Sequence, residues 1–94
     1  MKGLYSTTIA SLLLKLHPRT IMKYEKEGLI KPERTPTGRR IFSNEDLRRL
    51  LLIKYLREEQ KLGLPAIKLI FEKNLVHLFP DFDPDKRLKQ LFQE

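Results

Sequence analysis

The chain contains no cysteine among its 94 residues, and it has only two histidines, His17 and His77. Without cysteine it forms neither disulfides nor thiolate metal sites, and thiol-based redox sensing is excluded. The histidines belong to no Ser/His/Asp set, metal-ligand cluster or glycine-rich phosphate loop. We therefore expect a protein that is not an enzyme and that binds no cofactor.

The sequence also lacks any hydrophobic run of transmembrane length. The leucines at 12–14 are too few for the core of a signal peptide, and Lys15 follows them directly. We expect a cytoplasmic protein that does not associate with membranes. A chain of 94 residues makes one small domain with a limited core.

Positive charge is abundant and unevenly placed. The net charge of +7 and the isoelectric point near 9.9 favour a polyanionic partner. Residues 15–40 hold eight basic residues against three acidic ones, which accounts for +5 of the total. An evenly solvated charged surface would not concentrate charge in this way, so we expect this segment to face a nucleic acid.

Residues 17–28 have the pattern of a short basic helix. His17 is expected at the N-cap, and Pro18 suits the first helical position because its missing N–H would be unpaired there. Gly28 would end the helix by adopting positive φ. On a period of 3.6 residues, Ile21 and Tyr24 share the inward face. The outward face then holds Arg19, Met22, Lys23 and Lys26, with Thr20 in the first turn.

A basic hairpin is expected next, over residues 30–42. The segments 29–34 and 39–42 have strand-like character. Thr35-Pro36-Thr37-Gly38 lies between them, and proline at the second turn position with glycine at the last favours a tight turn. Three arginines cluster around this turn: Arg34, Arg39 and Arg40. Guanidinium groups bond phosphate bidentately, so these are candidate phosphate contacts. The alternative is that Arg40 pairs with a carboxylate and only braces the hairpin.

Together these segments resemble the MerR family of winged-helix transcription regulators. The resemblance rests on TIMKYE (20–25), GL (28–29), PERT (32–35), GRR (38–40), Phe42 and SNEDL (43–47). It covers roughly residues 5–72, and the opening Leu-His-Pro-x-Thr at 16–20 is most similar to the heat-shock repressor, or HspR-type, branch. The metal-sensing and iron–sulfur branches of the family use cysteines, so this chain does not belong with them in function.

The resemblance implies a mainly α fold, a winged helix-turn-helix with a small two-stranded β-hairpin wing over residues 1–74. A short tail with a helix at 84–93 would follow. It also implies a sequence-specific regulator of transcription, by its branch a repressor, that binds double-stranded DNA. Helix 18–28 would enter the major groove and hairpin 30–42 would contact phosphates. The residues expected to contact DNA are His17, Arg19, Thr20, Met22, Lys23, Tyr24, Lys26, Arg34, Arg39 and Arg40.

Two positions depart from the family pattern. Met22 stands where the family usually has an arginine that contacts DNA, and Lys15 stands where the first helix-turn usually has glycine. Arg19 and Lys23 lie on the same outward face as Met22 and could replace the missing cation. Met22 could instead touch a thymine methyl group in the major groove.

The remaining helices are expected to form the scaffold. Ser6 is the candidate N-cap of a helix near 7–15, with Ile9 facing inward and Leu14 surplus to the core. Ser43 and Asp46 approximate a capping box that opens a helix over 43–61. We expect Gly63 to end that helix, and a fourth helix to run over about 65–73.

The tail leaves assembly open. Its helix would carry Leu88, Leu91 and Phe92, and about ten helical residues span only about 15 Å, too short for an extended coiled coil. We therefore expect a monomer or weak dimer that pairs mainly on DNA. These three residues form an apolar stripe, which would pack on the third and fourth helices or contact a second copy of the chain. The tail could also bind a protein partner. Two alternative functions are a protein-interaction module such as a chaperone modulator, and an excisionase-type architectural DNA-binding factor.

Overall fold

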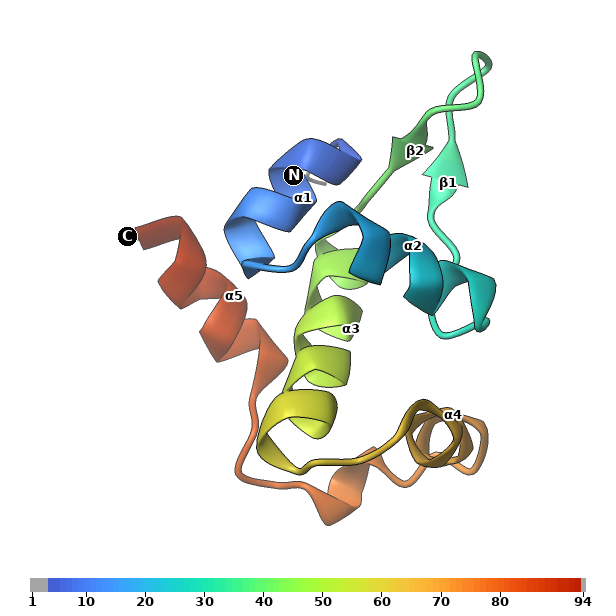
Figure 1. The fold of residues 1–94 in the computed structure, drawn as a ribbon. Coiled ribbons are helices and arrows are strands. Elements are labelled where there is room, and N and C mark those ends of the chain that lie inside the picture. Colours follow the sequence, from blue (N-terminus) through green and yellow to red (C-terminus); the bar gives the residue numbers. More distant parts are fainter. Residues whose placement is uncertain (1–3, 94) are drawn as a thin grey trace.

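Helix α3 (Asn44–Lys54) is the centre of the molecule. The computed structural model describes residues 4–93. Figure 1 shows α1 (Thr7–Leu14) and α2 (Pro18–Lys26) across the upper part of α3, α5 (Pro84–Gln93) along one side and α4 (Leu64–Glu72) below. An antiparallel hairpin of β1 (Glu33–Arg34) and β2 (Arg40–Ile41) projects beyond α2. The expected winged helix-turn-helix is confirmed.

The sequence signals at the helix starts are confirmed. The Ser6 hydroxyl accepts the N–H of Ile9 at the start of α1. His17 caps α2 by accepting the N–H of Arg19 at Nδ1, at 3.1 Å. Ser43 and Asp46 exchange hydrogen bonds of 3.0 and 2.9 Å, which completes the capping box of α3. These bonds satisfy N–H groups that have no partner inside their helices.

The helix-turn-helix turns at Lys15. This residue has left-handed backbone angles, φ 54 and ψ 45, and its N–H donates to the carbonyl of Ser11. Glycine adopts this conformation without steric cost. The geometry therefore explains why glycine is usual at this position in the family that the sequence resembles.

The core surrounds α3 and includes Leu47, Leu50, Ile53 and Leu56, all fully buried. The inward face of α1 differs from the expectation. Leu14 is only 1% exposed, whereas Ile9 is 45% exposed. Since α1 ends at Leu14, its inward face is set by Ala10 and Leu14, one turn apart.

The third helix is shorter than expected. Its α-helical part ends at Lys54 and continues as a π-helical turn, Tyr55–Glu59. The chain then reverses at Lys61, which has φ 58, and the N–H of Leu62 donates back to Leu56. Gly63 does not end this helix; it is the N-cap of α4. The expectation that Gly63 would end the helix is therefore wrong, because the chain reverses at Lys61.

The tail packs on the core as one of its layers. Leu88 of α5 is 6% exposed and contributes to the core cluster, and Arg48 of α3 pairs with Asp85 of α5 at 2.9 Å. Phe82, just before α5, stacks on Tyr55 with ring centroids 4.5 Å apart. Helix α5 therefore packs on α3 through Leu88, whereas Phe92 of the same helix is 49% exposed and stacks on Tyr5. Across residues 4–93, each helix is too short or too polar to span a lipid bilayer.

Candidate nucleic-acid interface

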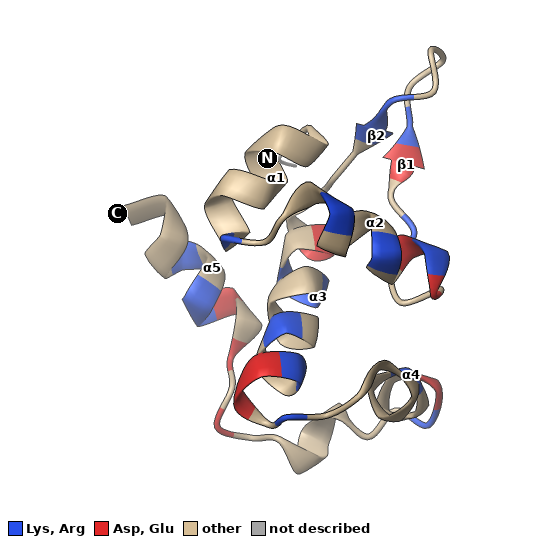
Figure 2. Ribbon diagram, in the orientation of Figure 1, with Lys and Arg blue, Asp and Glu red and all other residues tan. Residues whose placement is uncertain are grey.

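Helix α2 presents a basic groove on its outward face. Ile21 and Tyr24 are 1% and 4% exposed and anchor the helix to the core, so the opposite face points to solvent. This face lines an open groove together with Arg40 of the wing. The groove residues on and directly after α2 are Arg19, Met22, Lys23, Glu25, Lys26 and Glu27. Figure 2 shows the basic residues along α2 and on the adjoining β2. The four residues that the helical period placed on the outward face, Arg19, Met22, Lys23 and Lys26, therefore line one groove.

Three of the sequence candidates on α2 and its cap have other surroundings. His17 is exposed and its Nδ1 is engaged as the helix cap. Thr20 is half-buried in the first turn. Burial raises the pKa of the Tyr24 hydroxyl, an effect that the nearby charge of Arg57 opposes. We therefore assign Tyr24 to the core, where it holds the basic face outward.

The segment between α2 and the hairpin is fixed by Arg49 of α3. Its Nε donates to the carbonyl of Leu29 at 2.6 Å, and its guanidinium lies 3.9 Å from the centroid of the Phe71 ring. Burial lowers the pKa of Arg49, although Asp46 and Glu45 oppose the shift. Leu29 and Arg49 lie 20 residues apart, so the sequence alone carried no sign of this contact.

The wing is a tight hairpin. The N–H of Gly38 donates to the carbonyl of Thr35 at 2.9 Å, and Gly38 has φ +87, which favours glycine. The Thr35 hydroxyl also accepts the N–H of Arg39 at 3.0 Å. In the strands, Arg34 lies directly opposite Arg40. The expected turn is confirmed, with strands of only two residues each.

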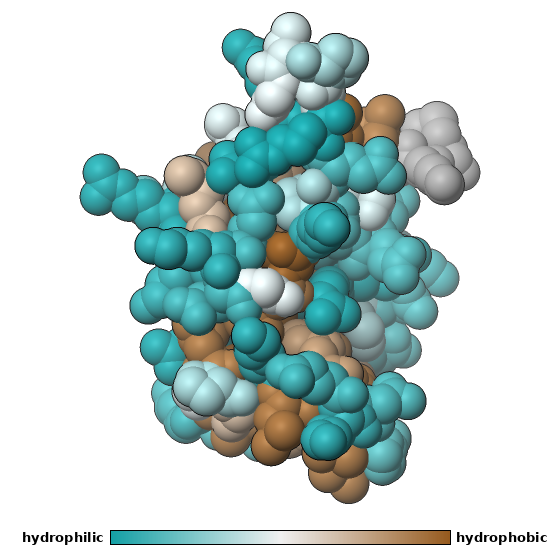
Figure 3. Space-filling view, turned by 90° about the vertical axis from the view of Figure 1, so that its right-hand side faces the viewer, coloured by the Kyte–Doolittle hydropathy of each residue, from teal (hydrophilic) through white to brown (hydrophobic). Residues whose placement is uncertain are grey.

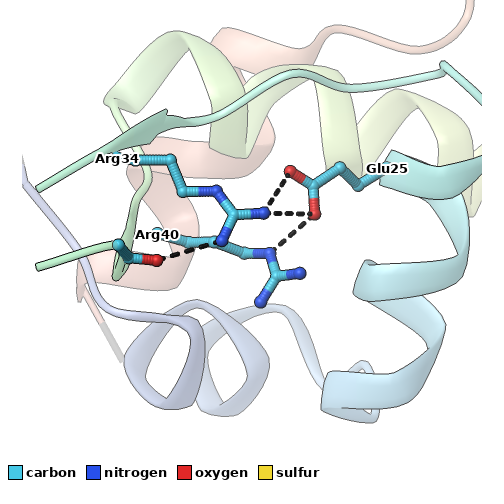
Figure 4. A network of polar contacts seen from close by, with 4 residues as sticks. Glu25, Arg34 and Arg40 are labelled. Atoms are coloured by element: carbon cyan, nitrogen blue, oxygen red, sulfur yellow. Dashed lines mark hydrogen bonds and ion pairs between the residues drawn. The ribbon is translucent and has the colours of Figure 1, made fainter.

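Glu25 of α2 joins both strands of the wing. Its carboxylate accepts from Arg40 Nε at 2.6 Å and from Arg34 Nη2 at 3.2 and 3.4 Å (Figure 4). Arg34 Nη1 also donates to the carbonyl of Gly38 at 3.0 Å. Burial would raise the pKa of Glu25, but the hydrogen bond to Arg40 and the charges of Arg40 and Arg34 outweigh it and lower the pKa. Arg40 thus makes the bracing contact that was the alternative to phosphate binding, and Arg34 shares it.

Arg39 differs from its two neighbours. It is exposed, and within residues 4–93 its guanidinium takes part in no ion pair. It lines a second groove, between the wing and the start of α1, together with Ser6, Thr7, Thr8, Gly38 and Arg40. The hydroxyl residues before and at the start of α1 were not among the sequence candidates. Only the fold brings them beside residues 38–40 of the wing, which are 30 or more positions away in the chain.

The face that carries α2 and the hairpin is polar in its upper part. Figure 3 shows mostly hydrophilic residues over the wing and α2, and hydrophobic residues gathered lower down. Leu69 of α4 is 51% exposed, and Leu78, which follows α4 in the chain, is 60% exposed. On this face, hydrophilic residues therefore surround the wing and α2, and hydrophobic residues lie below them.

Comparisons with known proteins agree with this geometry. The family model described as "MerR HTH family regulatory protein" matches residues 5–74. A protein of Streptomyces coelicolor that carries the name heat shock protein HspR is 34% identical over 68 residues, which is 72% of this chain and 45% of that protein. The transcriptional regulator GlnR of Bacillus anthracis is 39% identical over 67 residues, covering 71% of this chain and 51% of its own length. The chain thus spans about half the length of the curated relatives it matches.

A solved structure is also similar. The MerR family regulator HiNmlR, which lacks the sensor domain and was crystallised bound to promoter DNA, superimposes with a TM-score of 0.72 at 26% identity. The match covers 97% of this chain and 74% of that one, so it includes the part that follows the hairpin. A family model over residues 5–74, relatives above 30% identity and a shared fold lead to one conclusion: the chain belongs to the MerR family of helix-turn-helix regulatory proteins.

Proposed function

We propose that this protein is a sequence-specific double-stranded DNA-binding transcription regulator that acts as a repressor. The observation that carries the proposal is the basic groove of α2, in which Arg19, Lys23 and Lys26 lie beside the wing. A helix with exposed cations and a buried opposite face can enter the major groove. The sign of regulation follows from the similarity to the heat-shock repressor branch. The proposed location is the cytoplasm.

In this proposal, the groove along α2 contacts bases and the groove beside the start of α1 contacts phosphates. Arg19 and Lys23 are the proposed base readers, and Met22, 43% exposed between them, is the proposed apolar contact to a thymine methyl. Arg39, Arg40 and the start of α1 are the proposed phosphate contacts. Arginine on an exposed hairpin suits phosphate because its fork of donors bonds two oxygens at once.

A salt titration on two kinds of DNA tests this function. We would enrich a duplex from a random-sequence pool with the native chain, and compare it with a scrambled duplex. Replacing Arg39 by alanine should weaken binding to both equally and lower the slope of log K against log salt by about 0.9. Replacing Arg19 or Lys23 should cost about 1–3 kcal/mol on the enriched duplex only.

Lys89 provides the matched control. It is an exposed cation on α5, away from the hairpin in Figure 1, so Lys89→Ala removes one charge without touching either groove. This variant should retain the native preference for the enriched duplex. If no duplex is enriched, or if Arg19→Ala and Lys23→Ala both keep the native preference, α2 does not read bases.

A protein-interaction module is the second candidate. Within residues 4–93, seven large apolar side chains are more than 40% exposed, among them Leu4, Leu12 and Met22. A module of this kind would need its apolar surface and would tolerate loss of the α2 cations. The same alanine variants therefore separate the two functions, because only DNA binding requires Arg19 and Lys23.

A further inference from the structure

We propose that Glu25 is a positioning residue that sets DNA specificity by tying the wing to α2. The inference rests on the proposed DNA-binding function. One carboxylate contacts an arginine from each strand of the hairpin, so the two DNA-facing elements meet a duplex as one unit. Glu25 itself need not touch DNA.

The base of the wing is anchored by buried Phe42 and by the bond from Arg49 to Leu29, and the contacts of Glu25 hold the part of the hairpin beyond that base. Its strands are two residues long, and an isolated two-stranded hairpin is marginally stable in water. Arg34 and Arg40 are cross-strand partners, and like charges directly opposite destabilise a strand pair. The carboxylate of Glu25 lies between the two cations and offsets their repulsion.

The tie extends from the base of the hairpin to its turn. Arg34 uses Nη2 for Glu25 and Nη1 for the carbonyl of Gly38. It therefore connects α2, β1 and the turn through one side chain. Loss of the carboxylate would release both strands from α2 and leave the bond from Arg34 to Gly38 as a contact within the hairpin alone.

The tie leaves Arg40 able to bind phosphate. Only its Nε contacts Glu25, at 2.6 Å, and Figure 4 shows its two terminal nitrogens pointing away from the carboxylate. Arg40 also lines both grooves, the one along α2 and the one beside the start of α1. Glu25 thus orients a guanidinium whose terminal donors face the proposed path of the phosphates.

The carboxylate has a second, opposite effect. As a negative charge in a groove proposed to meet phosphates, it weakens binding to DNA of any sequence. Replacing Glu25 by glutamine should therefore raise general affinity and at the same time lower the preference for one sequence. Neither a pure charge effect nor general damage to the fold produces both changes together.

The experiment compares Glu25→Gln with Glu27→Gln. Glu27 lines the same groove and forms no ion pair within residues 4–93, so the two variants lose the same charge. Both should bind a scrambled duplex more tightly and with a steeper salt dependence. Only Glu25→Gln should lower the affinity ratio of the enriched to the scrambled duplex, by about fivefold, the scale of one ion pair.

A measurement on the free protein tests whether Glu25 holds the wing, independently of whether the protein binds DNA. Backbone NMR relaxation of residues 36–39 should show a more mobile turn in Glu25→Gln and an unchanged one in Glu27→Gln. Arg40→Lys, which keeps the charge but lacks Nε, should also loosen the turn. A rigid turn in both Glu25→Gln and Arg40→Lys, or an unchanged affinity ratio in Glu25→Gln, overturns the proposal. If the native chain enriches no duplex, the proposed function fails, and the relaxation measurement still decides whether Glu25 holds the wing.

Discussion

Single residues decide where the helices end. Lys15, Lys61 and Asn74 have φ of 54, 58 and 55, and they follow α1, the π-helical turn and α4. Asparagine tolerates this region, but a lysine β-carbon crowds the following carbonyl at a cost of about 1–2 kcal/mol. The fold therefore retains local strain at two lysines that a glycine would relieve.

Replacing Lys15 by glycine should stabilise the protein. Removal of the β-carbon relieves the left-handed strain, and the greater freedom of glycine in the unfolded chain offsets part of the gain. We expect the free energy of unfolding to rise by about 0.5–1 kcal/mol, measured by urea denaturation. Lys15→Ala loses the charge but keeps the β-carbon, so it should bring no such gain. Equal stability of the glycine and alanine variants would contradict the explanation.

The Glu25 carboxylate makes stability depend on acidity. Its pKa is lowered in the folded state from an ordinary value of 4.5. The associated stabilisation is therefore complete above the ordinary value and is lost as the pH falls through the lowered pKa. Urea denaturation of native protein at about pH 6 and about pH 3 should show a larger loss than in Glu25→Gln. Parallel losses in the two proteins would assign the acid sensitivity to other carboxylates.

Residues with local partners were predictable, and residues with distant partners were not. Ser6, His17 and Ser43 bond to N–H groups two or three positions away, so their chemistry and spacing suffice. Glu25 and Arg40 are 15 positions apart, and the 20 positions between Arg49 and Leu29 likewise hide their contact. Only the folded chain selects such partners among many similar charges.

At the scale of elements, α5 belongs to the core that α3 organises. Leu88 is 6% exposed, whereas Leu12 on α1 is 69% exposed. Leu88→Ala should lower the free energy of unfolding by about 2–4 kcal/mol, because it removes buried surface and leaves a cavity. Leu12→Ala makes the same chemical change at the surface and should alter stability by less than about 0.5 kcal/mol. Chemical denaturation of both variants checks this, and equal effects would show that α5 is not docked in solution.

The boundaries of elements were harder to predict than their existence. The apolar pattern of residues 44–56 required a helix, but it could not show that the last turn is π-helical. Leu14 was misassigned although it lies one helical turn from Ala10, so that the helical repeat alone places the two on one face. The π-helical turn, in contrast, has no signal in the helical repeat.

At the scale of the whole molecule, one copy has principal extents of 37 × 30 × 22 Å. One turn of DNA is about 34 Å long, so a single copy covers about one turn. We expect two copies to bind an inverted repeat, with their α2 helices in successive major grooves about 34 Å apart. Footprinting of the enriched duplex should show two protected half-sites. Sedimentation with and without DNA should show that pairing depends on DNA, and one protected half-site would contradict this arrangement.

The overall architecture was predictable because its signals are dense and local. Basic residues, a tight turn and helix caps follow one another between residues 15 and 46. The two grooves were not predictable, because they join α2 to β2 and α1 to the wing across the fold. A pattern along the chain identifies elements, whereas a binding surface is made by their arrangement.

Tyr5 stacks on Phe92 with ring centroids 5.9 Å apart, and this contact has a mechanical consequence. A pulling force applied at Leu4 and Gln93 would load the Tyr5–Phe92 stack first, together with the two hydrogen bonds between Tyr5 and Phe42. Because Phe42 directly follows β2, these two bonds would pass part of the load to the base of the wing. Because the chain has no cysteine, thiols introduced at these two positions would be the only attachment points for such a tether.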